Sequence, residues 1–140
     1  SREVYIVRPA ELLADAVKEM HRRHVGALVV VEERPHQVHP VGVVTDRDAI
    51  RAQVLQGKGL RHLTIANAMT AEPLMLLETC GLHEAIGQMS ARGVRRAPVV
   101  SESGDLFGIV SFDDLLPVVS EQLTALARLI GGQARREGAQ

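Results

Sequence analysis

The chain has 140 residues, of which 46% are apolar and 24% are charged, a composition that suits one compact globular domain. Its 17 acidic residues nearly balance its 16 lysines and arginines, so charge alone does not draw the whole protein to nucleic acid or anionic lipid. Aromatic residues are only 2% and no apolar run approaches the roughly 20 residues of a bilayer span, so we expect a soluble protein of the cytoplasm.

The first half of the chain predicts a strand, a helix, two strands and a second helix. Residues 4–7 form the first short strand, and apolar residues recur at helical spacing through 13–20. The apolar run within 22–31 is typical of a buried strand, and another strand is expected at 41–44. Between these strands, the polar residues of 32–40 predict a loop.

The first motif, GVVTDRDAI at residues 42–50, ends a strand and begins a helix. Thr45 is placed as a helix N-cap, and Asp48 would close a capping box, a local role that needs no ligand. A strand end that leads into a helix N-terminus is also where α/β proteins hold phosphorylated ligands. There a hydroxyl can meet a phosphate, a carboxylate can accept from both ribose hydroxyls, and Gly42 permits close backbone approach. Both interpretations stay open.

After a turn-prone segment at 56–59 and a connector at 65–73, the same order of elements returns. The elements are a strand at 74–77, a helix at 82–89, a strand within 91–100, a loop at 101–105 and a strand at 106–110. A last helix is expected over 117–130, beginning at Pro117, and residues 131–140 are expected to be frayed.

The two halves are therefore repeats of one unit. The matching apolar residues of the two helices, 69 positions apart, are Leu13 and Leu82, Ala16 and Ala85, Val17 and Ile86, and Met20 and Met89. The second motif, GIVSFDDLL at residues 108–116, follows the first by 66 positions because the first loop is longer by three. Its Ser111 and Asp114 match Thr45 and Asp48. A unit of about 60 residues buries little surface alone, so we expect the two units to pack into one core.

These segments together resemble a tandem pair of CBS domains, a family named for cystathionine β-synthase. GVVTDRD and GIVSFDD fit the family's signature of Gly, two apolar residues, Ser or Thr, and Asp three positions on. The RRAPVV strand and the AVKEM and AIGQM helices fit as well, so the resemblance covers the chain from about Val4 to Val119. It implies an α/β (α+β) fold of two β-α-β-β-α repeats, residues 1–62 and 63–130, packed as a pseudo-twofold module, with 131–140 as a tail.

The resemblance also implies that adenine nucleotides bind in clefts between the repeats. The residues it assigns are Asp48 and Asp114 for the ribose, Thr45 and Ser111 for the phosphate, and Gly42, Gly108 and Pro98 for the base pocket and close backbone approach. Both repeats keep the motif positions, so neither cleft is excluded by its motif.

Three arginines add positive charge near these positions. Arg95 and Arg96 immediately precede the APVV strand, where the first repeat has Gly26 and Ala27. Arg47 lies inside the first motif. Each arginine either pairs with a phosphate bidentately or faces solvent, and both interpretations stay open.

Signals for a metal site or a catalytic centre are weak. His21 with His24, and His36 with His39, have zinc-compatible spacing, but no further ligand completes a set, so we expect solvated pairs. Cys80 is the single cysteine, which excludes an internal disulfide, and we interpret it as structural. No nucleophile with a base and an orienting group is recognisable, so we expect no catalysis, no metal and no required cofactor.

The leading hypothesis is a regulatory, energy-sensing module that modulates an unidentified target protein. Its ligand would be AMP, ADP or ATP, or a related adenosyl compound such as S-adenosylmethionine or NAD. The resemblance further implies a homodimer, a flat disc of two CBS pairs, and Leu13, Val17, Leu82 and Ile86 are candidates for a face shared with the core or a partner. The alternatives are a constitutive dimerisation or scaffold module without ligand and, third, a nucleotide-processing enzyme.

Overall fold

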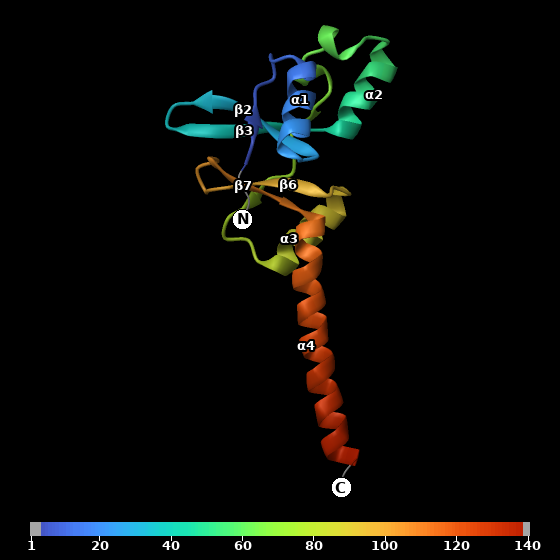
Figure 1. Cartoon of the computed structure of the whole chain (residues 1–140). Coiled ribbons are helices and arrows are strands. Elements are labelled where there is room, and N and C mark those ends of the chain that lie inside the picture. The colour runs from blue at the N-terminus through green and yellow to red at the C-terminus, as the bar shows by residue number, and fades with distance from the viewer. Residues whose placement is uncertain (1–3, 139–140) are drawn as a thin grey trace.

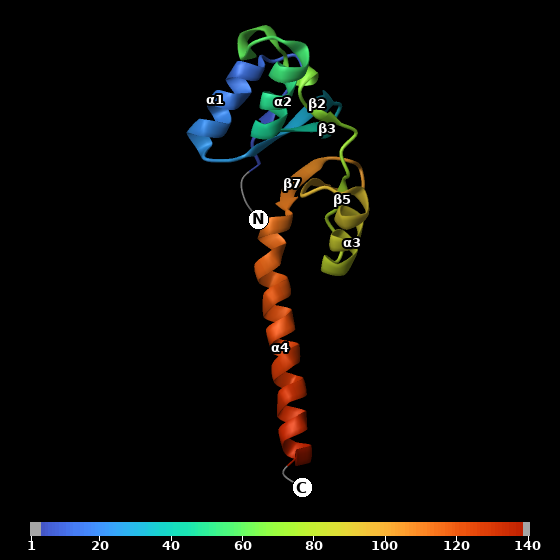
Figure 2. The same ribbon diagram turned by 90° about the vertical axis from the view of Figure 1, so that its right-hand side faces the viewer.

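The computed structural model describes residues 4–138, with side chains through residue 131. Two repeats lie one above the other, and a long C-terminal helix projects from the second (Figure 1, Figure 2). The first repeat comprises β1 (Ile6–Val7), α1 (Leu13–Arg23), β2 (Ala27–Arg34), β3 (Gln37–Thr45) and α2 (Asp46–Gln56). The second comprises β5 (Leu76–Leu77), α3 (Leu82–Arg92), β6 (Arg96–Val100), β7 (Leu106–Ser111) and α4 (Phe112–Gly138). The predicted fold class and the order of elements are confirmed.

Each repeat builds a small sheet around one antiparallel hairpin. The hairpins are β2–β3 and β6–β7, and a short strand, β1 or β5, runs parallel to the first strand of each. The first sheet gains a fourth strand, β4 (Thr70–Ala71), which comes from the predicted connector and pairs with β3. Figure 1 shows β2 and β3 above β6 and β7, with α1 and α2 beyond the first sheet and α3 beyond the second. The sheets therefore lie between the helices of the two repeats.

Helices α1 and α3 form where the apolar spacing predicts them. Their buried residues are Leu13, Ala16 and Met20 in α1 and Ala85 and Met89 in α3. Each helix ends on a residue with left-handed backbone, Gly93 after α3 and His24 after α1, with φ of 64° and 55°. Glycine is the usual residue at this position, so His24 holds a conformation that most side chains avoid.

The larger hydrophobic core belongs to the first repeat. Its buried residues are Val7, Leu13, Ala16, Met20, Leu28, Val30, Val44, Ala49, Ala52, Leu63 and Ile65. Within the described residues, the cluster of the second repeat consists of Leu76, Ala85, Met89 and Ala97. Because stabilisation grows with the apolar area removed from water, most of the core's contribution comes from the first repeat.

The loop predicted at 32–40 is wrong for most of its length. β2 and β3 continue to either side of a two-residue turn at 35–36. The second repeat supports this longer hairpin: the N–H of Val38 donates to Asp105 Oδ1 at 2.7 Å, and His39 Nδ1 lies 3.1 Å from a backbone oxygen of the same loop. These bonds join residues far apart in the chain, so local composition does not reveal them.

Helix α4 corrects the predicted last helix at both ends. It begins at Phe112, directly after β7, so Pro117 lies inside it rather than at its start. A proline this close to the N-terminus removes one backbone hydrogen bond, and the helix continues past it. The helix extends to Gly138, so 131–138 is helical rather than frayed, and 139–140 lie outside the described residues. None of the described helices combines the length and apolar character that crossing a membrane requires.

Candidate functional site

Two clefts open between the repeats. Cleft A, of about 620 Å³, lies between residues 4–5 and 24–27 of the first repeat and the second motif. Cleft B, of about 300 Å³, lies between residues 73–74 and 93–96 and the first motif. Small-molecule sites typically measure about 300–1,000 Å³, so both clefts have the size of ligand sites.

The internal repeat relates the two clefts, because matching residues of the two repeats form them. Residues 24–27 and 93–96 are the matching turns before β2 and β6, and each faces the motif of the other repeat. The register of the hairpins agrees, because Ala27 pairs with Thr45 and Arg96 pairs with Ser111. Arg96 therefore occupies the position that Ala27 has in the first repeat.

The first motif forms a complete capping box at the start of α2. Thr45 Oγ1 accepts from the N–H of Asp48 at 3.1 Å, and Asp48 Oδ2 accepts from the N–H of Thr45 at 2.9 Å. Asp48 is only 7% exposed, and its Oδ1 lies 3.4 Å from Arg51 Nη1. The predicted local role is confirmed here, and Asp48 reaches cleft B with one oxygen already used by the backbone.

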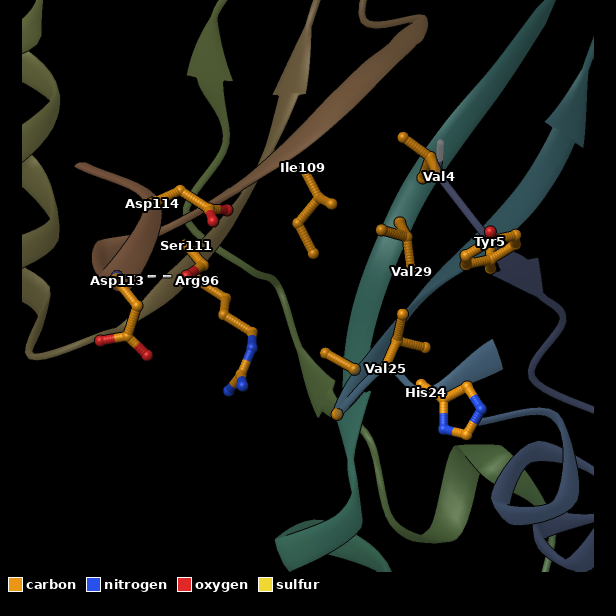
Figure 3. A pocket seen from close by; sticks show the side chains of 12 residues that line it. Val4, Tyr5, His24, Val25, Val29, Arg96, Ile109, Ser111, Asp113 and Asp114 are labelled. Atoms are coloured by element: carbon orange, nitrogen blue, oxygen red, sulfur yellow. Dashed lines mark hydrogen bonds between the residues drawn. The ribbon is translucent and has the colours of Figure 1, made fainter. Parts of the chain in front are cut away.

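The second motif holds the same residue types in a more open setting. Ser111 Oγ accepts from the N–H of Asp113 at 3.1 Å, two residues on rather than three (Figure 3). Asp113 Oδ1 in turn lies 3.0 Å from Arg95 Nη2. Asp114 is exposed and lines cleft A on the same side as Ser111. The second motif thus presents a hydroxyl and a carboxylate to the cleft.

Tyr5 and His24, which the sequence analysis missed, lie across cleft A from Ser111 and Asp114 (Figure 3). The left-handed backbone of His24 ends α1 and places the imidazole at the cleft. The Arg23 guanidinium lies 4.2 Å from the centroid of the Tyr5 ring. The apolar lining consists of Val4, Val25, Ala27, Val29 and Ile109. Cleft A therefore combines an apolar lining with polar groups on both sides.

Cleft B is rich in arginine. Its four arginines are Arg51, Arg92, Arg95 and Arg96. Arg51 and Arg92 were not predicted; Arg51 follows Asp48 by one helical turn, and Arg92 Nη2 lies 3.3 Å from the Glu72 carbonyl oxygen. The spacing of Arg51 from the motif aspartate is the signal that points to it in the sequence.

Arg96 lines both clefts, whereas Arg47 lines neither. Within residues 4–138 the Arg96 side chain forms no ion pair or hydrogen bond. Its Nη2 lies 3.3 Å from the place a Cβ on Gly26 would occupy, so glycine at that position leaves room for the guanidinium. Arg47 is exposed near the start of α2, and its assignment to a phosphate stays a prediction.

The three residues assigned to the base pocket lie outside the linings of clefts A and B. A Cβ on Gly42 would stand 2.7 Å from Met69 Sδ and 3.0 Å from the Thr70 carbonyl oxygen, so the close approach at Gly42 is to the segment around β4. A Cβ on Gly108 would meet no atom within 4 Å. Pro98 is buried in the middle of β6.

The histidines and Cys80 do not come together in one site among the described residues. Among the side chains that the structure describes, no group of three or more His, Cys, Asp or Glu residues is arranged to hold a metal ion. His39 lies on β3 rather than in a loop. Burial, with a smaller contribution from the negative charge of Glu84, raises the pKa of the Cys80 thiol. A thiol with a raised pKa is mostly protonated at neutral pH and is a poor nucleophile.

Known proteins are similar to this chain in sequence and fold. The family model of the CBS domain matches residues 1–55 and 65–121. An uncharacterised protein of Methanopyrus kandleri is 31% identical over 117 residues, which are 84% of this chain and 58% of that longer protein. A CBS domain protein from Burkholderia ambifaria superposes with a TM-score of 0.74 at 30% identity, over 84% of this chain and 83% of that one. A CBS domain protein from Pyrobaculum aerophilum, solved in complex with AMP, has a TM-score of 0.72 at 26% identity, over 82% and 85%.

Proposed function

The chain belongs to the CBS domain family, and on this premise we propose that it is a regulatory module whose clefts bind the adenine nucleotides AMP, ADP or ATP. The observation that carries the proposal is the composition of cleft A. The Ser111 hydroxyl, the Asp114 carboxylate and the Arg96 guanidinium lie around one space, next to an apolar wall (Figure 3). The AMP bound to the Pyrobaculum aerophilum relative supports this ligand class.

Each group in cleft A meets a different part of a nucleotide in this proposal. The Asp114 carboxylate accepts from both ribose hydroxyls, which favours a ribonucleotide over a deoxynucleotide. The phosphate lies at Ser111 and the N-terminus of α4, where the positive end of the helix dipole favours an anion. Arg96 adds charge-assisted bonds to the phosphate, and the valines of the opposite wall pack against the base.

Cleft B is a second nucleotide site with a different charge balance. Four arginines face two acidic residues, Asp48 and Glu72, in its lining. Positive charge in excess favours a ligand with more phosphate groups, so cleft B prefers ADP or ATP over AMP. Both clefts lie between the repeats, so a bound nucleotide contacts both repeats at once. In this proposal, that link between the repeats transmits nucleotide binding to a target protein. The proposed role is binding without catalysis.

A thermal-shift screen tests the proposal. AMP, ADP, ATP, adenosine, S-adenosylmethionine and NAD are each added to the full chain at millimolar concentration. A ligand present at 100 times its dissociation constant stabilises the folded state by about 2.7 kcal/mol, which raises the melting temperature by several degrees. The phosphorylated adenosines should stabilise most. An unchanged melting temperature with every ligand would overturn the proposal and favour a constitutive scaffold.

We further propose that the module is a homodimer that uses the outer faces of α2 and α4. Exposed apolar residues on α2 are Ile50, Val54 and Leu55. On α4, Leu116, Val119, Leu123, Leu126 and Ile130 follow one another at alternating spacings of three and four. This spacing is typical of helices that pack on helices of the same pattern, and after its first turns α4 has no other element beside it (Figure 1, Figure 2). A second copy of the chain supplies a matching helix.

The residues expected on a face shared with the core or a partner divide between the two. Leu13 is fully buried in the first core, whereas Val17, Leu82 and Ile86 are half-buried. Sedimentation of the full chain should give about twice the monomer mass of 15.2 kDa. Leu123→Lys should shift the protein to the monomer, and Thr124→Lys, away from the apolar face of the same helix, should not. A wild-type monomer at micromolar concentration would refute the dimer.

A further inference from the structure

Arg96 is the point where the two clefts meet. It is the first residue of β6, and it lines cleft A together with the second motif and cleft B together with the first. The internal repeat explains why Arg96 lines cleft B but not why it also lines cleft A. As the counterpart of Ala27, Arg96 belongs to the wall of cleft B, and its long side chain also reaches cleft A.

The surroundings of Arg96 leave it available to a ligand. Glycine at position 26 makes space for the guanidinium, whereas the matching residue of the second repeat is Arg95. Arg95 is itself paired with Asp113. The Arg96 side chain has no hydrogen-bonding partner within residues 4–138. Among the side chains that the structure describes, this positive charge has no partner, and it lies between two candidate anion sites.

The clefts depend on this charge to different extents. Among the described residues, Arg96 is the one arginine in the lining of cleft A, where Asp113 and Asp114 contribute negative charge. Cleft B has three further arginines. A guanidinium has five N–H donors, and the donors that it gives to a phosphate in one cleft are no longer available to a phosphate in the other. Two bound phosphates also repel each other across the short path between the clefts.

We propose that Arg96 is a phosphate-binding residue shared by both clefts, so that a nucleotide bound in one cleft weakens the binding of a nucleotide in the other. This inference rests on the proposed function, since it requires that both clefts take phosphorylated adenosine. The coupling is reciprocal, because each ligand must lower the affinity of the other by the same factor. When Arg96 turns to cleft B, cleft A loses a larger share of its phosphate affinity than cleft B loses in the reverse case. The reason is that the described lining of cleft A contains no second arginine.

Calorimetric titration of AMP into single-site variants measures the coupling. Asp114→Ala disables cleft A, and Asp48→Asn disables cleft B while keeping an oxygen for the capping box. With a shared Arg96, each variant should bind AMP about tenfold more tightly than the second binding step of the wild type. In the Arg96→Ala background this difference should disappear, and at cleft A, whose lining has no other arginine among the described residues, most of the advantage of AMP over adenosine should disappear with it. Arg61→Ala removes an exposed arginine that lines neither cleft and should leave the coupling intact.

Adenosine separates the possible failures, because it has no phosphate to compete for Arg96. Its two binding steps in the wild type should match the affinities in the single-site variants. If AMP behaves in the same uncoupled way, or if the coupling survives Arg96→Ala, the sharing is overturned while the proposed function stands. If neither AMP nor adenosine binds any variant, the result refutes both the proposed function and the sharing of Arg96 between the clefts.

Discussion

The two repeats place one residue pattern in two different settings. In the first, Thr45 and Asp48 close a capping box, and Asp48 is nearly buried. In the second, Ser111 accepts from Asp113, and Asp114 is exposed at cleft A. The first motif thus caps its helix with both side chains, while the carboxylate of the second lies at cleft A. A shared signature fixes where residues lie in the repeat, and the surrounding packing decides how much of each residue is left for binding.

The hydrophobic cores of the two repeats also differ, and the first repeat is again the more buried one. The first repeat buries residues from all its elements and from the segment that follows α2, whereas the buried cluster of the second is small. The first repeat therefore has the larger buried core, and the motif of the second is the more exposed one. Variants at matched positions of the two repeats test this difference.

The largest expected effect is in the core. Leu13→Ala should lower the free energy of unfolding by about 2–5 kcal/mol, because Leu13 is fully buried in the larger cluster. The matched change Leu82→Ala should cost about 1 kcal/mol, because Leu82 is half-buried and water can replace part of its contacts. Urea unfolding followed by circular dichroism measures both. Equal losses would mean that the two cores contribute equally.

A smaller effect is expected at the matched glycines. In Gly42→Ala the new methyl group would collide with Met69 and the backbone at Thr70, which should cost about 1–3 kcal/mol. Gly108→Ala places its methyl group in open space and should be neutral or stabilising by up to about 1 kcal/mol, since it removes a strand glycine. Thermal unfolding of both variants decides. A destabilised Gly108→Ala would reveal a contact at β7 that a second copy supplies.

The motif aspartates should separate folding from binding. Asp48→Ala removes the capping box and should lower the free energy of unfolding by about 1–2 kcal/mol. Asp114→Ala should lower it by about 0.5 kcal/mol or less, because Asp114 is exposed. In AMP titrations the order should reverse for cleft A, where Asp114→Ala removes the ribose contact. If Asp114→Ala lowers stability and leaves AMP affinity unchanged, the second motif serves only the fold.

The smallest effect is expected at the two ion pairs beside the motifs. The Arg95 and Asp113 side chains are 68% and 66% exposed, so Arg95→Ala should change the free energy of unfolding by about 0.5 kcal/mol or less. Arg51 pairs with the nearly buried Asp48, so Arg51→Ala should cost slightly more, about 0.5–1 kcal/mol. Melting curves at low and high salt test the difference. A larger loss at Arg95 would show that this pair holds the second motif in place.

Local patterns in the sequence predict the helices, the hairpins and the motif positions. The apolar spacing at 13–20 and 82–89 gives α1 and α3 because one helical face must be buried whatever the rest of the chain does. The capping box at Thr45 and Asp48 is equally local, since its two bonds join residues three apart. The signature of the family then assigns the clefts, which composition alone does not.

What the sequence does not predict depends on contacts between the repeats. The long β2–β3 hairpin rests on the bond from Val38 to Asp105, which lies in the other repeat. Tyr5 and His24 become lining residues only because the first repeat faces the second motif. The close neighbour found at Gly42 is the segment around β4, which is remote in the chain from the motif, and the approach of a ligand there stays a prediction.

The most direct test of nucleotide binding between the repeats is the mapping of amide chemical shifts by NMR as AMP is added to the full chain. The account predicts that the shifts concentrate at the walls of cleft A, in residues 24–27 and 109–114, and extend with more ligand to 43–48 and 93–96 of cleft B. Shifts that are absent, or that fall on the exposed part of α4 and leave both clefts unchanged, would contradict it.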